Sequence, residues 1–335
     1  MEDVLYLVEN NYNIRILDSK PMKNIYKLRD DKGEEYCLKV IKYNYPHFYF
    51  ILSAILHLQK RGFQKIPKIM KTINEEYFIR INDKFAYLMP WIDSRESNYD
   101  NPIDLYRAAK KLGEFHKFSS NFIINKDMNP RIGWFTWINT FRVRGEEILD
   151  FEKRAHQKIF KSDFDKLFLS MIPREINSIN KTLENLKNNN YYEVMNKEVT
   201  KLNFCHHDYA YHNVLVDKND EINIIDFDYC ILDTHIHDLS SLMIRAMKDG
   251  KWDLKKANLI IEGYLKAGWL TNEEIPLMSA FMEFSQGFWQ VGLQYYWERQ
   301  PWEEENFMRR LIKYKEDIEY RQEFVEEFKH FKVVK

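Results

Sequence analysis

The chain has 335 residues, enough for a sizeable hydrophobic core and, by the usual size of domains, for two lobes. Its 50 Lys and Arg residues nearly balance its 51 Asp and Glu residues, so the net charge of −1 gives no electrostatic reason to expect DNA, RNA or an anionic membrane as a partner. The three cysteines, Cys37, Cys205 and Cys230, lack metal-binding spacing and are odd in number, which favours buried thiols in a reducing compartment.

No secretory signal is expected, because Met1 to Tyr12 lacks a basic start followed by an apolar run. No stretch reaches the ~18 uninterrupted apolar residues of a membrane span. The sequence therefore predicts a soluble, cytosolic protein with no membrane partner.

The first part of the chain is predicted to form a small, mostly β lobe. Residues Asn24 to Lys42 alternate as two strands around a turn, with Lys39 inside the second strand. Apolar positions at helical spacing predict a helix from Tyr49 to Arg61. A second hairpin is predicted from Glu76 to Met89, and the chain then leaves through Pro90 to Ile92.

Beyond about residue 100 the pattern becomes helical, interrupted by two short strands at 213–217 and 222–226. Three apolar stripes have helical spacing: Leu105, Ala108, Leu112 and Phe115; Ile172, Ile176, Ile179, Leu183 and Leu186; and Phe281, Phe284, Phe288, Val291 and Tyr295. These patterns predict an α+β protein with a β-rich N-lobe over residues 1–91 and a mainly helical C-lobe over residues 92–335.

The segment from His206 to Asn213 fits the catalytic-loop pattern of kinases: histidine, any residue, aspartate, four residues and asparagine. Asp208 at the start of this loop can accept the proton of an acceptor hydroxyl. Asn213 can offer a carbonyl oxygen to Mg²⁺, and Asp226, at the end of the returning strand, can offer a carboxylate to the same ion. The sequence therefore predicts a magnesium site that handles nucleotide phosphates, with Asp208 as the catalytic base.

These residues, together with Asp238-Leu239, resemble the aminoglycoside phosphotransferases and choline kinases. The resemblance implies a two-lobed protein-kinase-like fold, with ATP and Mg²⁺ as cofactors and a small molecule as acceptor. It also implies that Lys39 holds the α- and β-phosphates and that Met89 to Ile92 form the hinge beside adenine, with Met89 and Trp91 as nucleotide-binding residues.

Three further residues are expected to support the site. His206 is typical of a structural histidine that is bonded to backbone, and the resemblance implies that Asp238 braces the catalytic loop. Asp228 stands where protein kinases have the glycine of their Asp-Phe-Gly motif.

Softer motifs resemble, more narrowly, the CotS-type spore coat proteins of endospore-forming bacteria. The motifs are Leu38-Lys39-Val40-Ile41, His57-Leu58, Gly62-Phe63, Ile66-Pro67, Leu112-Gly113-Glu114-Phe115-His116 and the closing Trp- and Tyr-rich helices. This resemblance implies production in the mother-cell cytoplasm, final location in the spore coat, and other coat proteins as partners.

Two departures from the kinase pattern bear on nucleotide binding. The segment from Asp18 to Asn24, where the nucleotide-covering turn is expected, contains no glycine. No acidic residue occurs between Glu35 and Glu75, so Lys39 lacks its usual glutamate partner on the following helix. The sequence therefore leaves two readings open: an active phosphotransferase, or a catalytically inactive kinase-fold protein with a structural or binding role in the coat.

Two further alternatives use the same part of the sequence. His206-His207-Asp208 with His235 and His237-Asp238 could form a two-metal phosphohydrolase centre, but such centres are normally built on helices and Asp208 precedes a strand. The aromatic residues from Trp289 to Trp302 could line an acceptor pocket, although a helical aromatic stripe is more typical of a core.

Overall fold

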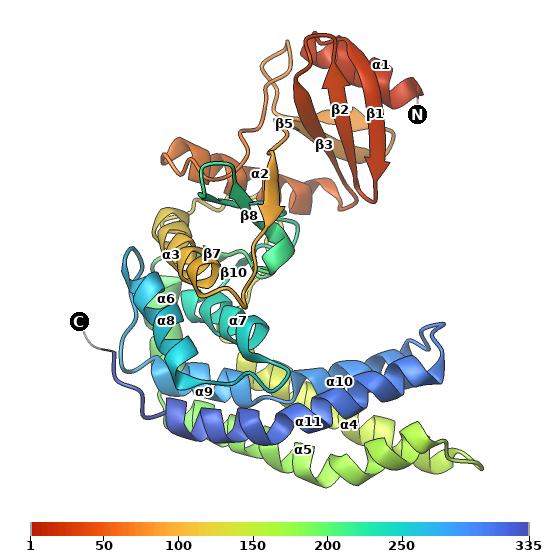
Figure 1. The fold of residues 1–335 in the computed structure, drawn as a ribbon, viewed down its shortest axis with the longest axis vertical. Helices are drawn as coiled ribbons and strands as arrows, with labels where there is room; N and C mark the ends of the chain where they lie inside the picture. The colour runs from red at the N-terminus through yellow and green to blue at the C-terminus, as the bar shows by residue number, and fades with distance from the viewer. Residues whose placement is uncertain (1, 334–335) are drawn as a thin grey trace.

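The computed structural model describes residues 2–333, which form a small upper lobe and a larger helical lobe (Figure 1). The N-lobe contains a five-stranded antiparallel sheet in the order β1-β2-β3-β5-β4. Its elements are α1 (Glu2–Tyr12), β1 (Ile16–Met22), β2 (Ile25–Asp30), β3 (Glu35–Ile41), α2 (Tyr45–Lys60), β4 (Ile79–Ile81) and β5 (Lys84–Pro90). The predicted α+β class and the two-lobed arrangement are confirmed.

The sheet of the N-lobe has two different faces. Leu38 of β3 and its register partner Leu88 of β5 join the small core that contains Val8 of α1. Because side chains alternate along a strand, Lys39 and its partner Tyr87 lie on the opposite face. This alternation turns Lys39 toward the C-lobe.

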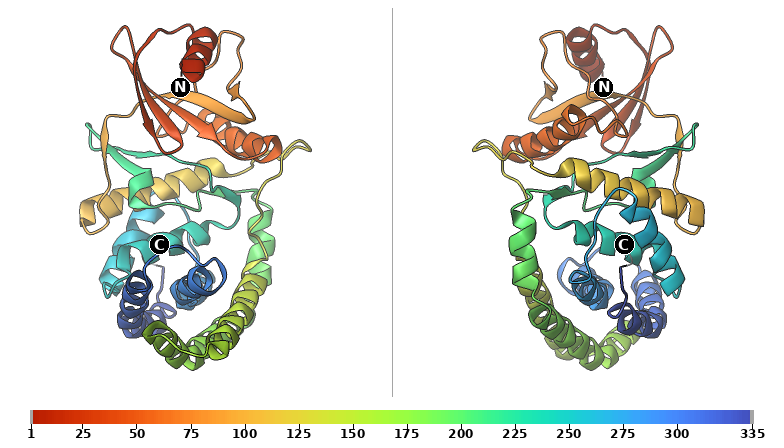
Figure 2. Two further views of the ribbon diagram at one scale, coloured as in Figure 1. Left: turned by 90° about the vertical axis from the view of Figure 1, so that its right-hand side faces the viewer. Right: turned by 90° about the vertical axis from the view of Figure 1, so that its left-hand side faces the viewer.

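Helix α2 begins and ends at sequence signals. The side chain of Asn44 accepts a hydrogen bond from the backbone N–H of His47 at 3.3 Å, and Pro46 lies in the first turn. Gly62, with a φ of 89°, follows the last turn in the left-handed region that glycine adopts without strain. The helix lies between the sheet and α3 (Pro102–Ser119), the first helix of the C-lobe (Figure 2).

The C-lobe is mainly helical and carries two small sheets. Strand β6 pairs with β8, which pairs with β9, and β7 pairs with β10. Its elements are β6 (Ser94–Glu96), α3 (Pro102–Ser119), α4 (Trp137–Gln157), α5 (Asp163–Asn188), α6 (Tyr191–Val199), β7 (Phe204–Cys205), the 3₁₀ turn η1 (Tyr211–Asn213), β8 (Val214–Asp217), β9 (Ile222–Ile224), β10 (Ile231–Leu232), α7 (His235–Met247), α8 (Leu254–Leu265), α9 (Ile275–Glu283), α10 (Gln286–Gly292), the π-helical segment η2 (Leu293–Trp297) and α11 (Glu304–Phe328).

Two helices of the C-lobe pack very closely. Helices α3 and α8 approach so closely that a Cβ at Gly113 would lie 2.3 Å from the carbonyl oxygen of Tyr264. The predicted stripe on α3, from Leu105 to Phe115, is fully buried.

Within residues 2–333, no helix is both long and apolar enough to span a membrane.

Three details differ from the sequence prediction. Most of the segment expected as a turn at Asp18 to Asn24 is strand β1, and the tight turn is Lys23-Asn24, with Lys23 at a φ of 53°. The aromatic stripe from Phe281 to Tyr295 does not form one helix, because the chain turns out of helical geometry at Phe284. Cys37 is only partly buried, since it lies on the sheet face that points toward the C-lobe.

Candidate active site

The hairpin β8–β9 brings the two predicted metal ligands together. Asn213 ends η1 immediately before β8, and Asp226 lies two residues beyond β9. The backbone N–H of Ile225 donates to the carbonyl oxygen of Asn213 at 3.0 Å, which fixes the two ends of the hairpin side by side. Asp226 has a φ of 65°, in the left-handed region that aspartate adopts more readily than most residues other than glycine.

Asp208 is held by two side chains. Its Oδ2 accepts a hydrogen bond from Asn213 Nδ2 at 3.0 Å, and its Oδ1 forms an ion pair with Arg245 Nη2 at 2.8 Å. Arg245 lies in the last turn of α7, 37 residues downstream, so no motif in the loop could have indicated it. The carboxylate is thus oriented from both sides while remaining partly exposed.

The donor set at the hairpin fits a hard cation. Both hydrogen bonds of the Asn213 side chain are donated by Nδ2, which leaves Oδ1 without a hydrogen bond to any residue of the described chain. Asp226 Oδ1 pairs with Lys39, and Oδ2 makes no hydrogen bond within residues 2–333. One amide oxygen and one carboxylate oxygen are therefore available, and oxygen is the donor that Mg²⁺ prefers.

Lys39 reaches across from the N-lobe and contacts two carboxylates. Its Nζ lies 2.5 Å from Asp226 Oδ1 and 2.8 Å from Asp228 Oδ1. Burial alone would lower the pKa of Lys39, but the carboxylates of Asp228 and Asp226 outweigh burial and raise it. The lysine is thus a buried cation whose partners come from the hairpin loop instead of from helix α2.

The two carboxylates respond differently to this lysine. Burial would raise the pKa of Asp226, but the adjacent Lys39 ammonium lowers it, so the carboxylate stays ionised. Burial raises the pKa of Asp228, Lys39 opposes this change, and the neighbouring charge of Asp226 adds to it. Of the two predicted site carboxylates, Asp226 is thus the one that stays ionised, as a metal ligand must, and Asp228 completes the ion pair.

Helix α7 supports the catalytic loop through Asp238. Its Oδ2 accepts the backbone N–H of His206 at 2.6 Å, and its Oδ1 accepts that of His207 at 2.8 Å. Burial alone would raise the pKa of Asp238, but its hydrogen bond with His116 and the other nearby histidines hold this pKa well below its usual range. A fully buried carboxylate thus fixes two consecutive peptides of the loop.

His206 is engaged on both ring nitrogens. Its Nε2 lies 2.9 Å from the carbonyl oxygen of Ile225, and its Nδ1 lies 3.3 Å from the backbone nitrogen of Asp208. Burial lowers the pKa of His206. A neutral ring that donates from Nε2 and accepts at Nδ1 satisfies both contacts, and it ties the loop to the end of β9.

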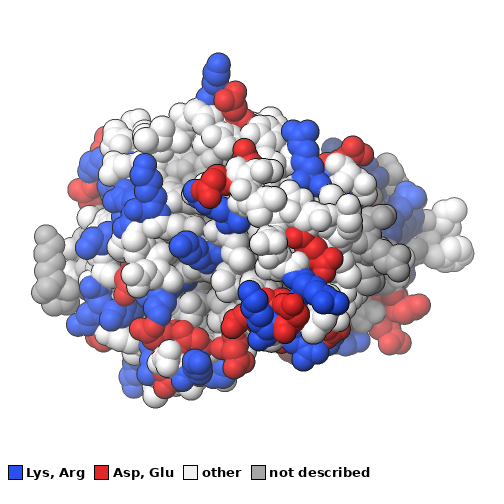
Figure 3. Space-filling view, turned by 90° about the horizontal axis from the view of Figure 1, so that it is seen from above, with Lys and Arg blue, Asp and Glu red and all other residues white. Residues whose placement is uncertain are grey.

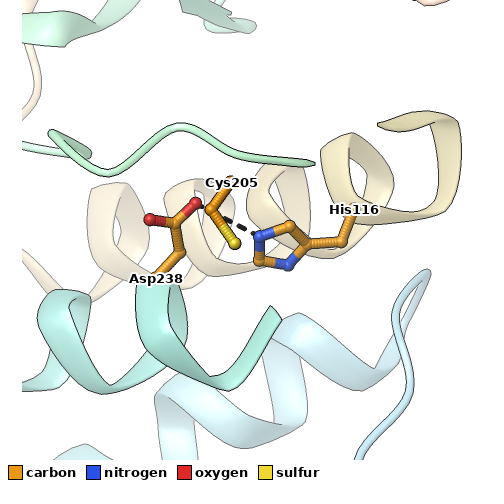
Figure 4. Close-up of side chains that lie close together, drawn as sticks. All are labelled: His116, Cys205 and Asp238. Carbon is orange, nitrogen blue, oxygen red and sulfur yellow. Dashed lines mark hydrogen bonds and ion pairs between the residues drawn. The ribbon is translucent and has the colours of Figure 1, made fainter. Parts of the chain in front are cut away.

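Two buried clusters have metal-ligand residue types, but most of their donor atoms already have partners, His235 Nε2 being the atom without a hydrogen bond in the described chain. In the first, shown in Figure 4, His116 Nε2 lies 3.3 Å from Asp238 Oδ2, and Cys205 Sγ donates to the carbonyl oxygen of Thr234 at 3.1 Å. In the second, His235 lies between Glu198 at 2.9 Å and Glu274 at 3.4 Å. Both are better explained as hydrogen-bonded networks that fix α7.

The phosphohydrolase alternative receives no support from this geometry. His206 binds backbone, His235 pairs with two glutamates, and His237 Nδ1 lies 3.2 Å from Asp233. Asp208 precedes a strand, not a helix. The histidines therefore do not converge on a common centre.

The hinge residues lie where the chain crosses between the lobes. Met89 pairs with Cys37 in the sheet, and the backbone N–H of Trp91 donates to the carbonyl oxygen of Glu35 at 2.8 Å. The Nζ of Lys27 lies 4.6 Å from the centre of the Trp91 indole ring. Their contact with adenine remains a prediction.

On the outer face of the N-lobe, basic and acidic side chains are interspersed (Figure 3).

The site lies in a fold with known relatives. The structure is similar to an aminoglycoside phosphotransferase from Alicyclobacillus acidocaldarius subsp. acidocaldarius, with a TM-score of 0.85 and 21% identity over 96% of this chain and 94% of that chain. It is also similar to spectinomycin phosphotransferase in complex with ADP and spectinomycin (TM-score 0.61, 18% identity, 97% and 96% of the two chains). The choline kinase LicA from Streptococcus pneumoniae has a TM-score of 0.53 and 11% identity over 96% of this chain and 98% of its own.

At these identities the likeness shows the fold alone, and no curated protein matches the chain. A match to a family covers residues 22–270, which include Lys39, the catalytic-loop segment and the β8–β9 hairpin. The chain therefore belongs to the phosphotransferase enzyme family, whose members share this two-lobed, kinase-like fold.

Proposed function

We propose that the protein transfers the γ-phosphoryl group of ATP to a hydroxyl or amine of a small-molecule acceptor, in a reaction that depends on Mg²⁺. One observation carries the proposal. Lys39 of the N-lobe and Asp208, Asn213 and Asp226 of the C-lobe come together around the β8–β9 hairpin. ATP as donor is supported by the complex of spectinomycin phosphotransferase with ADP.

The residues have separable roles in this proposal. Asp208 accepts the proton of the acceptor, and Arg245 and Asn213 hold its carboxylate in place. Lys39 neutralises phosphate charge, and Asn213 and Asp226 hold the metal through their free oxygens. Mg²⁺, when bound, would offset the negative charge of the β- and γ-phosphates. Positioning and charge neutralisation supply most of the rate.

The test of nucleotide binding is the thermal stability of the purified protein with millimolar ATP and Mg²⁺. Saturation at 100 times the dissociation constant would stabilise the protein by about 2.7 kcal/mol. We expect this shift in the wild type and in Asp220→Asn, an exposed position in the same hairpin, and we expect it to disappear in Asp226→Ala. An equal shift in Asp226→Ala would reject the metal site.

The test of turnover is ADP release in the presence of acceptors. Asp208→Asn should lower acceptor-dependent release by about 100-fold or more while it preserves the nucleotide shift. Undiminished transfer by Asp208→Asn would exclude Asp208 as the base. A nucleotide shift without transfer to any acceptor would favour the catalytically inactive, structural or binding role.

We further propose that the protein is made in the mother cell and becomes part of the spore coat, where other coat proteins are its partners. The support is the sequence resemblance to CotS-type proteins, which includes Leu38-Lys39-Val40-Ile41 and Leu112 to His116. Fractionation of spores from an endospore-forming host should place the protein in the insoluble coat layer. Recovery only among soluble vegetative proteins would reject this location.

A further inference from the structure

A cavity of about 690 Å³ lies in the C-lobe next to the catalytic loop. Helices α4, α7, α9, α10 and α11 supply most of its wall, and His207 and Arg245 line its end near Asp208. A volume of this size suits a small molecule. The cavity is therefore the natural place for the acceptor, and its chemistry limits what that acceptor can be.

The charged side chains that line the cavity are mostly basic. They are Arg144, Arg245, Lys248, Arg310, Lys313 and Arg321 on the basic side, and Asp233, Asp249 and Asp317 on the acidic side. The excess of positive charge is the reverse of what choline or an aminoglycoside, which are cations, would require.

Each carboxylate of the cavity is already engaged. Asp249 pairs with Lys313 at 2.9 Å, and Asp317 accepts hydrogen bonds from the backbone of Gly250 at 2.7 Å and from the indole of Trp252 at 2.8 Å. Burial raises the pKa of Asp233 to about 7, so this carboxyl group is only partly ionised at neutral pH. A cationic acceptor would therefore find little free negative charge.

Two guanidinium groups, in contrast, have only neutral hydrogen-bond partners. Arg144 Nη1 donates to Gln286 Oε1 at 2.6 Å, and Arg310 donates to the side-chain oxygen of Gln294. Neither has a carboxylate within 4.0 Å anywhere in residues 2–333. Burial lowers the pKa of both groups; the more distant Glu147 opposes this change at Arg144 without overcoming it, and no charged group opposes it at Arg310.

Arg144 is also held in a fixed orientation. Its guanidinium carbon lies 4.2 Å from the centre of the Trp289 indole ring, and the nearby Glu147 accepts a hydrogen bond from that indole. Nη1 of this stacked guanidinium donates to Gln286, and Nη2 and Nε make no hydrogen bond within residues 2–333, so they are the groups that can donate two parallel hydrogen bonds to a carboxylate or phosphate. Beside it, Phe141 and Phe284 stack at 4.0 Å and offer an apolar wall.

We propose that the acceptor is a hydroxyl-bearing small molecule with a carboxylate or phosphate group, which Arg144 binds while the hydroxyl faces Asp208. The inference rests on the proposed phosphotransfer. In that reaction the acceptor oxygen forms a bond to the γ-phosphorus, the bond from this phosphorus to the β,γ-bridging oxygen breaks, and ADP leaves. The hydroxyl proton passes to Asp208.

The experiment uses the full-length protein and two matched series of compounds. Glucose 6-phosphate, glucose and glucosamine share a ring, and 3-phenyllactate, 3-phenylpropane-1,2-diol and phenylalaninol share an aromatic body; each series has an anionic, a neutral and a cationic member. Thermal shift is measured with each compound alone, and ADP release is measured with MgATP. We expect shift and release with anionic members only.

The variants are Arg144→Gln, Arg144→Lys and Arg310→Gln, with Arg142→Gln as the matched control. Arg142 lies on α4, is exposed, and pairs with Glu146 outside the cavity. Arg144→Gln should raise the KM for the anionic acceptor about 10- to 100-fold, with a smaller change in kcat, and Arg144→Lys should recover part of the loss. The MgATP-induced shift should be unchanged, which also shows that each variant is folded.

The outcomes separate this inference from the proposed function. Absence of a MgATP-induced shift in the wild type would reject phosphotransfer. The thermal shifts with each compound alone would still show whether the cavity prefers an anionic, a neutral or a cationic ligand. Preference for neutral or cationic members, no response to any anionic member, or an anion response that Arg144→Gln and Arg310→Gln both retain, would overturn the inference.

Discussion

The guanidinium of Arg245, which lines the C-lobe cavity, forms an ion pair with the carboxylate of Asp208, with Nη2 and Oδ1 2.8 Å apart. Both side chains are partly exposed, at 34% and 27%, so the pair is not sealed from solvent. Asn213 holds the other carboxylate oxygen. The position of the proposed base is thus set jointly by the loop and by the end of α7.

Replacement of Arg245 should therefore impair turnover more than nucleotide binding. Arg245→Gln removes the charge that orients Asp208, and we expect kcat to fall by about 10- to 100-fold, because small displacements of a catalytic group have effects of this size. The MgATP-induced thermal shift should stay within error of the wild type. Lys255→Gln, an exposed change on α8, serves as control. Normal kcat in Arg245→Gln would show that Asn213 alone positions Asp208.

Lys39→Met should destabilise the protein, because it leaves the carboxylates of Asp226 and Asp228 side by side without their cation. Removal of one partner from a buried ion pair costs about 3 kcal/mol. Asp228→Asn in the same chain should recover part of this loss, since it removes one of the two repelling charges. Urea unfolding at pH 8 measures both effects.

The control for this series is Arg29→Met on the neighbouring strand β2, whose ion pair with Asp18 is exposed and long, at 3.9 Å. Its effect on the free energy of unfolding should be about 0.5 kcal/mol or less. If Lys39→Met were no more destabilising than Arg29→Met, the double ion pair would have no structural role. Failure of Asp228→Asn to rescue would show that the repulsion is not the cause.

Asp238→Asn should weaken the catalytic loop. The amide group can accept only one of the two backbone N–H groups of His206 and His207 that the carboxylate accepts, and the other would face the amide nitrogen. Loss of a buried, charge-assisted hydrogen bond should lower the free energy of unfolding by about 3 kcal/mol, and kcat should fall with it. Urea unfolding and ADP release report the two effects. Wild-type stability with reduced kcat would point instead to a direct role in chemistry.

The sequence predicted the architecture well because the periodicities that carry it are local. Alternation over Tyr36 to Ile41 sends Leu38 to the small N-lobe core and Ile41 to the main core, and the stripe from Leu105 to Phe115 is buried; both patterns depend only on neighbouring residues of one element. The break at Phe284 escaped prediction, because Ser285 and Gln286 carry no helix-stop signal and helical spacing continues on both sides.

The partners within the site were less predictable, because they join segments far apart in the chain. The sequence shows that no acidic residue lies between Glu35 and Glu75 to pair with Lys39. That Asp228 pairs with Lys39 instead depends on how the two lobes meet. Arg245 and Arg144 are isolated basic residues on helices, and such residues usually lie on the solvent-exposed face of the helix. Only the packing of α4, α7 and α10 shows that they line one cavity.

Asp233 should make folding stability depend on pH with a sign opposite to that of most carboxylates. Its side chain is fully buried, accepts the backbone N–H of Thr234 at 2.8 Å, and is packed so tightly that a Cβ at Gly133 would lie 2.4 Å from Oδ2. Burial raises its pKa from 3.8 to about 7, while the hydrogen bonds from Thr234 and Trp137 act in the other direction. Between these values the folded chain holds a proton that the unfolded chain has released.

The contribution of Asp233 is therefore greatest at acid pH and is lost as the pH rises from about 4 to about 7, by roughly 1.4 kcal/mol per unit. Asp233→Asn cannot ionise, keeps an oxygen for Thr234, and can donate to His237, whose pKa burial lowers to about 3. We expect the variant to match the wild type near pH 4 and to exceed its free energy of unfolding by about 4 kcal/mol at pH 8. Urea unfolding of both proteins at several pH values measures the difference, in which other titrating groups cancel. Parallel curves would mean that Asp233 is ionised in the folded protein, and that the cavity has one more negative charge than its packing implies.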